Sequence, residues 1–81
     1  MIANRRIKKL NSCLYRTVMV ILNNGMEYTG TLVPRNPIGY CIIYEEDDSE
    51  RVQFFYCSQL SELWLFEKGQ MKKVFSVIKD D

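Results

Sequence analysis

Apolar side chains recur at helical spacing near the start of the chain. Ile7, Leu10 and Leu14 are separated by three and four residues, which places them on one face of a helix. The spacing therefore predicts a short amphipathic helix over residues 3–14. The opposite face of this helix would be basic, because four cationic side chains occupy it: Arg5, Arg6, Lys8 and Lys9.

From residue 17 the pattern changes to that of a β-hairpin. Residues 17–22 are mostly apolar and rich in β-branched side chains, which predicts a strand covered on both faces. The turn sequence Asn-Asn-Gly at 23–25 follows, and Asn-Gly between two apolar segments is a strong hairpin signal. The return strand over 26–33 alternates apolar and polar residues. Gly30 lies at its middle, where a glycine indicates a bulge, a bend or a close approach of two backbones.

The remaining apolar segments predict a small β-barrel. Pro34 and Pro37 end the return strand at Val33, because proline cannot donate a ladder hydrogen bond. Further strands are expected over 40–44, 51–56, 63–66 and 71–78. Strands this short, separated by turns, are typical of a small barrel or sandwich. We therefore expect a mainly β protein that forms a single domain over residues 1–81, in which a short N-terminal helix precedes a small barrel or sandwich of short strands.

Aromatic residues divide between the predicted core and a second face. Trp64, Phe66 and Phe75 are expected in the core. Phe54 and Phe55 are adjacent in one strand, so their side chains point to opposite faces of the sheet. One of the two therefore leaves the barrel core, as do alternate residues of 17–22, and this second apolar face predicts a subunit interface.

Charge is unevenly distributed, although the net charge is only +1. Residues 1–16 hold five basic side chains and no acidic one, whereas five carboxylates cluster at 45–50, where we expect an exposed hairpin tip. This segregation predicts a basic and an acidic region on the folded surface. No apolar segment approaches the roughly 18 residues that a membrane span requires, and no secretory signal core follows the basic N-terminus.

Three cysteines and the absence of histidine limit the chemistry of the chain. Cys13, Cys41 and Cys57 are odd in number and form no C-x-x-C pair, so we expect neither a disulfide framework nor a zinc site. Buried, reduced thiols fit a cytoplasmic protein. The sequence also offers no nucleophile–base pair and no phosphate-binding glycine loop. We therefore expect no enzymatic activity, no metal and no cofactor.

The hairpin and the segment after it resemble the first motif of the Sm/LSm/Hfq family. In that family an apolar strand and a turn precede a Gly-x-Leu triplet, an Asp lies six residues after the Gly, and an Asn lies four residues further on. The triplet here is Gly30-Thr31-Leu32, with Asn36 at the Asp position and Tyr40 at the Asn position. The resemblance implies the fold of this family, in which a short N-terminal helix, here residues 3–14, precedes a small, strongly bent five-stranded SH3-like barrel, here 17–66. The segment over 71–78 would be a C-terminal extension that could add an extra strand.

The family's second motif is matched in its apolar spacing. Leu60 and Leu63 occupy the apolar positions, whereas Tyr56 and Cys57 replace the Arg-Gly pair of eukaryotic and archaeal members. Hfq-like proteins carry Tyr-Lys-His at about this point, so Tyr56 is similar to theirs. The resemblance extends over about residues 5–66, and it indicates a divergent member of the family.

The resemblance implies a homo-oligomeric ring of about five to seven subunits that binds single-stranded RNA with low sequence specificity. In the family the fourth strand pairs with the fifth strand of the next subunit, head to tail. Tyrosines near the pore would offer a stacking platform for a base, and the cations of the helix would neutralise phosphates. The residues expected to contact RNA are Asn36, Ile38, Tyr40, Tyr56, Arg5, Arg6, Lys8 and Lys9.

Other interpretations fit the same residues. The substitutions at the pore positions and the small net charge favour an oligomeric assembly module of the same fold that binds no RNA. An SH3-like peptide-binding barrel shares the same turns and alternation. Asn36 before a proline is ordinary turn chemistry, and Tyr40 begins a strand, where aromatic residues are favoured. The basic face of the helix would serve solubility alone in these alternatives.

Overall fold

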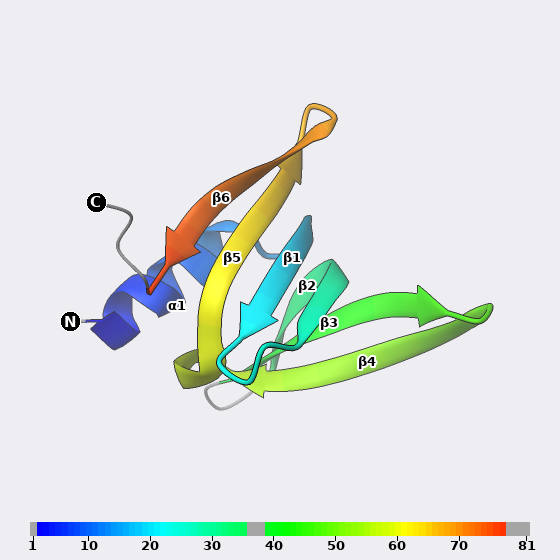
Figure 1. Ribbon diagram of the computed structural model, residues 1–81, viewed down its shortest axis with the longest axis horizontal. Helices are drawn as coiled ribbons and strands as arrows, with labels where there is room; N and C mark the ends of the chain where they lie inside the picture. Colours follow the sequence, from blue (N-terminus) through cyan, green and yellow to red (C-terminus); the bar gives the residue numbers. More distant parts are fainter. Residues whose placement is uncertain (1, 36–38, 78–81) are drawn as a thin grey trace.

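The protein is described by a computed structural model that covers residues 2–35 and 39–77. One helix precedes six strands that form a single antiparallel sheet with the order β4-β3-β2-β1-β5-β6 (Figure 1). The elements are α1 (Ile2–Ser12), β1 (Thr17–Leu22), β2 (Glu27–Arg35), β3 (Gly39–Glu46), β4 (Ser49–Tyr56), the 3₁₀ turn η1 (Cys57–Gln59), β5 (Leu60–Glu67) and β6 (Gln70–Ser76). The expected mainly β fold with an N-terminal helix is confirmed. The sheet has six strands rather than five, because the C-terminal extension pairs with β5.

The β1–β2 hairpin follows the predicted pattern closely. β1 begins and ends at the expected residues, and the turn is closed by hydrogen bonds from the Gly25 N–H to the Leu22 carbonyl (2.8 Å) and from the Leu22 N–H to the Met26 carbonyl (2.9 Å). Alternate β1 side chains, beginning with Val18, are buried, and Met19 on the other face is half-buried. Both faces of β1 are therefore apolar, as the sequence predicts.

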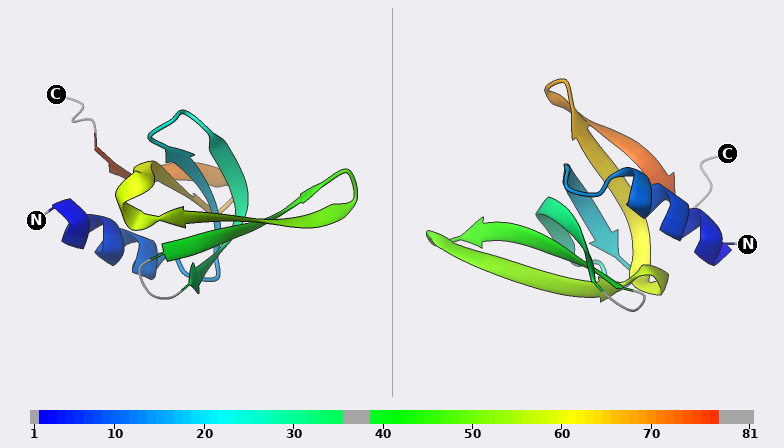
Figure 2. Two further views of the ribbon diagram at one scale, coloured as in Figure 1. Left: turned by 90° about the horizontal axis from the view of Figure 1, so that it is seen from below. Right: turned by 180° about the vertical axis from the view of Figure 1, so that it is seen from behind.

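Gly30 allows β2 and β3 to approach each other at the bend of the sheet. A Cβ atom at this position would lie 2.1 Å from the carbonyl oxygen of Ile43 and 3.0 Å from a methyl carbon of Ile42. Any larger residue would push the two strands apart. Of the three possibilities predicted for Gly30, a bulge, a bend or a close approach, the structure shows the close approach. The sheet curls around its concave face (Figure 2).

Strand β2 continues through Pro34 to Arg35, so the prediction that it ends at Val33 is wrong. Pro34 pairs with Tyr40 of β3. The Leu32 N–H donates to the Arg16 carbonyl on the β1 side (3.1 Å), and the nitrogen two residues later points to the same side. The β1–β2 ladder ends at Thr31, so no strand lies opposite the Pro34 nitrogen. The missing N–H of the proline therefore costs no ladder hydrogen bond.

Helix α1 is shorter than predicted at its C-terminus and ends at Ser12 rather than residue 14. The Ser12 hydroxyl donates back to the Lys9 carbonyl (2.6 Å), and the chain then turns. Tyr15 has a positive φ of 65°, and its N–H donates to the Leu32 carbonyl (2.6 Å). The residues after the helix are thus tied to β2 instead of extending the helix.

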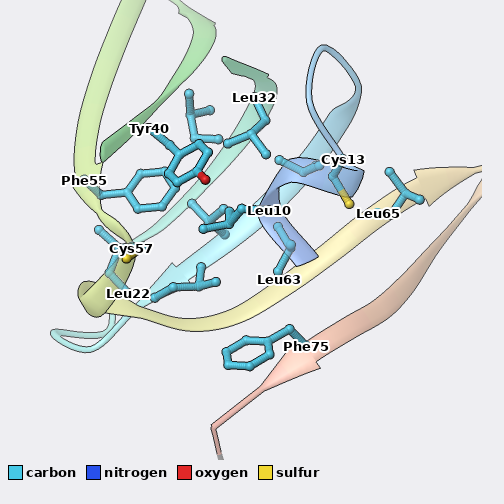
Figure 3. Packing of buried hydrophobic residues seen from close by; sticks show 14 residues of the cluster. Leu10, Cys13, Leu22, Leu32, Tyr40, Phe55, Cys57, Leu63, Leu65 and Phe75 are labelled. Atoms are coloured by element: carbon cyan, nitrogen blue, oxygen red, sulfur yellow. The ribbon is translucent and has the colours of Figure 1, made fainter. Parts of the chain in front are cut away.

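A single buried cluster joins α1 to all six strands. Phe55 of β4 and Phe75 of β6 come from the two edges of the sheet, yet both lie in this cluster, because the sheet curls around it (Figure 3). Phe54 is 36 % exposed, which confirms that the two adjacent phenylalanines face opposite sides. Phe66 is 46 % exposed and Trp64 is half-buried, so the expectation that both belong to the core is wrong. They alternate with core residues of β5 and therefore face the outer side.

The two edges of the sheet are β4 and β6 within the described residues. Strand β5 lies between β1 and β6 and has no open edge there. The subunit contact implied by the family resemblance requires an open edge of β5, which β6 occupies. The sixth strand therefore changes which backbone is accessible for association.

Candidate nucleic-acid interface

Tyr40, expected beside RNA, is a core residue. Its side chain is 6 % exposed and its ring stacks on Phe55 with centroids 6.0 Å apart (Figure 3). Its hydroxyl donates to Oδ1 of Asn11 in α1 (2.8 Å), which ties the helix to β3. Burial raises the pKa of the Tyr40 phenol, and the nearby Cys57 raises it further. In this conformation Tyr40 cannot serve as a stacking platform, and the structural explanation of this residue is favoured.

Tyr56 has the opposite placement and is accessible. It ends β4 on the outer face, is 48 % exposed and meets the Phe54 ring edge-on at a centroid distance of 4.9 Å. Its backbone N–H donates to Oε1 of Gln59 (2.8 Å), which fixes the chain at the start of η1. Asn36 and Ile38, the other expected pore residues, lie outside the described residues.

Arg35 joins these aromatic residues, although sequence analysis did not single it out. It pairs with Gly39, whose partner on the other side is Tyr56, so Arg35 and Tyr56 lie on the same face about 10 Å apart. A Cβ atom at Gly39 would lie 2.3 Å from the Phe54 ring, so this ring covers the glycine. Arg35, Phe54 and Tyr56 thus form one exposed surface, here called the aromatic surface. The available signal was the position of Arg35 directly before Asn36 in the sequence.

The four cations of α1 fall into two pairs. The guanidinium carbons of Arg5 and Arg6 lie 5.5 and 5.8 Å from the centroid of Phe75, and Arg6 Nε donates to the Leu60 carbonyl (3.1 Å). Both arginines therefore help to fix the helix on β5 and β6. Lys8 and Lys9 are exposed, and neither ammonium has a hydrogen bond or ion pair within residues 2–35 and 39–77. Only this second pair is fully available to phosphates.

The basic and acidic regions lie at opposite ends of the longest dimension, which is 39 Å (Figure 1). Helix α1 is at one end, and the β3–β4 hairpin projects from the other. As predicted, the acidic cluster forms an exposed hairpin tip, whose turn residues Asp47 and Asp48 have φ values of 54° and 63°. Arg51 faces Glu46 across the hairpin at 3.9 Å, a surface pair that contributes little to stability. A polyanion is therefore attracted to the helix end and repelled from the tip.

Further chemistry is not evident in the described part of the chain. All three cysteines are buried and free, as expected. No group of three or more His, Cys, Asp or Glu side chains is placed to hold a metal within the described residues. No helix among them is both long and apolar enough to cross a membrane. The chain matches no known protein-family profile and no curated protein.

Proposed function

We propose that this chain is a divergent Sm-like protein that self-associates and binds single-stranded RNA with low sequence specificity. The helix-first order and the close approach of β2 and β3 at Gly30 support the Sm-like assignment. The RNA proposal rests on one observation, the aromatic surface. Two exposed rings lie on the same face as an arginine about 10 Å away, so this surface offers both base stacking and phosphate neutralisation.

Stacking on Tyr56 is independent of base identity, because every base has a π-face. Removal of a stacking ring costs about 1–3 kcal/mol per base, which is a loss of affinity of about 5- to 150-fold. The Arg35 guanidinium would neutralise an adjacent phosphate and hold the strand on the rings. Lys8 and Lys9 supply a second, purely electrostatic contact with the same polyanion.

Binding of a short, unstructured, labelled RNA by fluorescence anisotropy tests the proposal. Tyr56→Ala should weaken binding at least about fivefold without changing its salt dependence, because the ring carries no charge. Tyr15→Asn is the matched control, since it removes an exposed ring outside the aromatic surface and both sheet edges, and asparagine tolerates the positive φ of 65° there. Equal effects of the two substitutions would argue against stacking on the aromatic surface.

The salt dependence separates the cationic contacts. Arg35→Ala, Lys8→Ala and Lys9→Ala should each reduce the slope of log affinity against log salt by about 0.7, the value for one phosphate of a single strand. Lys68→Asn is the control, because it removes one exposed cation from the β5–β6 turn and asparagine tolerates the positive φ of 53° there. All variants are first sized by light scattering, so that only variants with the wild-type assembly state are compared.

A second candidate is an assembly module that binds no RNA. The burial of Tyr40 favours it, because one of the two expected platforms is a core residue. Wild-type protein that assembles but shows no salt-dependent RNA binding would support this candidate over the first. Wild-type protein that stays monomeric at all concentrations would contradict both.

A further inference from the structure

We infer that the open edge of β4 pairs with the open edge of β6 in a second copy of this chain, so that one sheet continues from subunit to subunit. The inference rests on the self-association in the proposed function and specifies its interface. It differs from the contact implied by the family resemblance, in which β5 is the acceptor strand. In this chain β5 is enclosed between β1 and β6.

The direction of the strands permits this pairing. Neighbours in the sheet are antiparallel throughout, so β4 and β6 run in opposite directions along its two edges. When a copy is placed beside the first with the same face outward, its β6 runs antiparallel to β4. The contact is head to tail, and it leaves one β4 edge and one β6 edge open for further copies.

Over residues 52–56, beyond the charged Glu50 and Arg51, the edge of β4 lacks the charges and prolines that normally prevent association. Residues 52–56 contain no charge and no proline, and the register with β3 continues without a bulge. Val52 is 58 % exposed on the outer face. A long, regular and apolar edge of this kind is a template for another strand.

Apolar side chains lie on the outer face at both edges, with Lys73 of β6 beside them over the Trp64 ring, and the proposed pairing would bring the apolar side chains together. At the β6 edge, Met71 pairs with Phe66, which is 46 % exposed. At the β4 edge, Val52 is exposed on the same face of the sheet. Because cross-strand neighbours lie about 5 Å apart, pairing would bring Val52 close to the apolar side chains at the β6 edge of the neighbour and partly remove them from water.

Charge also favours a second copy as the occupant. Antiparallel pairing places the start of β4, beside Glu50 and the acidic tip, next to the end of β6 in the neighbour. At that end Arg5 and Arg6 lie over Phe75. The acidic hairpin of one subunit therefore approaches the arginines of the next, which favours this partner and this direction.

Complementation between two variants tests the inference. Val52→Lys adds a charge at the β4 edge, Met71→Lys adds one at the β6 edge, and Thr29→Lys adds the same charge to an exposed outer position of the internal strand β2. Light scattering after size exclusion should show that each edge variant raises the dissociation concentration at least about tenfold, whereas Thr29→Lys assembles like the wild type. A mixture of the two edge variants should form a 1:1 dimer and nothing larger, because one intact β4 edge then meets one intact β6 edge.

Several outcomes would overturn the inference. The β4–β6 pairing would be excluded if either edge variant alone assembled like the wild type, or if the mixture of the two variants stayed monomeric. Both results would leave self-association intact. A monomeric wild type would instead contradict the proposed function itself. Hydrogen exchange on the wild type is a second measurement that needs no variant. Amides of β4 and β6 should gain protection together as the protein concentration rises, and protection of one edge alone would contradict the pairing.

Discussion

Replacement of Gly30 by alanine should be among the most destabilising single-methyl additions in this chain. The new carbon would lie 2.1 Å from the Ile43 carbonyl oxygen, where 3.0 Å is the practical lower limit. The strands must therefore separate by about 1 Å, and a hydrogen bond lengthened from about 2.9 to about 3.9 Å is lost. Two ladder bonds at about 1 kcal/mol each, together with loosened packing around Ile42, give a loss of about 2–4 kcal/mol.

This loss is large relative to the stability expected for a chain of this length, about 4–12 kcal/mol. Urea unfolding at fixed protein concentration, followed by the fluorescence of the only tryptophan, Trp64, measures it directly. Thr29→Ala is the matched control, because this neighbouring side chain is exposed and its removal should cost less than about 1 kcal/mol. If Gly30→Ala shifts the midpoint no more than the control does, the tight approach of β2 and β3 is refuted.

Three further predictions concern other contacts. Tyr40→Phe should lower the free energy of unfolding by about 1 kcal/mol at neutral pH. Burial raises the pKa of Tyr40 in the folded protein, so the stabilisation by the protonated phenol is complete below about pH 10 and is lost as the pH rises through the pKa of the folded state. Urea titrations should therefore show a smaller alkaline decline in the free energy of unfolding for Tyr40→Phe than for the wild type. Equal declines would contradict this prediction. Gly39→Ala should cost about 0.5–1.5 kcal/mol in the wild type, because the exposed Phe54 ring must rotate away, and less with Phe54→Ala; additive effects in this double-mutant cycle would exclude the ring contact. Asp48→Gly should raise thermal stability by about 0.5–1 kcal/mol, since φ is positive there, whereas a loss would contradict the turn geometry.

Local patterns predicted the first half of the fold well, because the information lies within adjacent residues. The apolar segment 17–22 and the Asn-Gly turn specify a hairpin without reference to the rest of the chain. Gly30 is a similar case, since a mid-strand glycine indicates a close approach even before the partner strand is known. The pattern did not identify Ile43 as that partner.

The errors lie where distant segments decide the outcome. Pro34 remains in a strand only because the ladder of β1 ends before it, which no local rule detects. Tyr40 is buried because its ring packs on Phe55 in the core, and α1 places Asn11 where it accepts the hydrogen bond of the buried hydroxyl. Trp64 and Phe66 face outward because the core residues of β5 occupy the alternate positions. Both faces of this strand are apolar, so the alternation pattern does not show which face is buried. The aromatic surface likewise arises from cross-strand register, so only Tyr56 of its members was predicted.

The pairing order of the sheet also has a consequence for how the chain folds. Four of the five ladders in the described residues join strands that follow each other in sequence, and each can form as a separate hairpin. Only the β1–β5 ladder is non-local, since it pairs Val18 with Leu65 across 47 residues. The loss of chain entropy is therefore concentrated in one closure event, the docking of the β5–β6 hairpin onto β1. Stopped-flow refolding should accordingly be slowed by substitutions in the β1–β5 ladder, whereas substitutions near the β3–β4 tip should mainly accelerate unfolding.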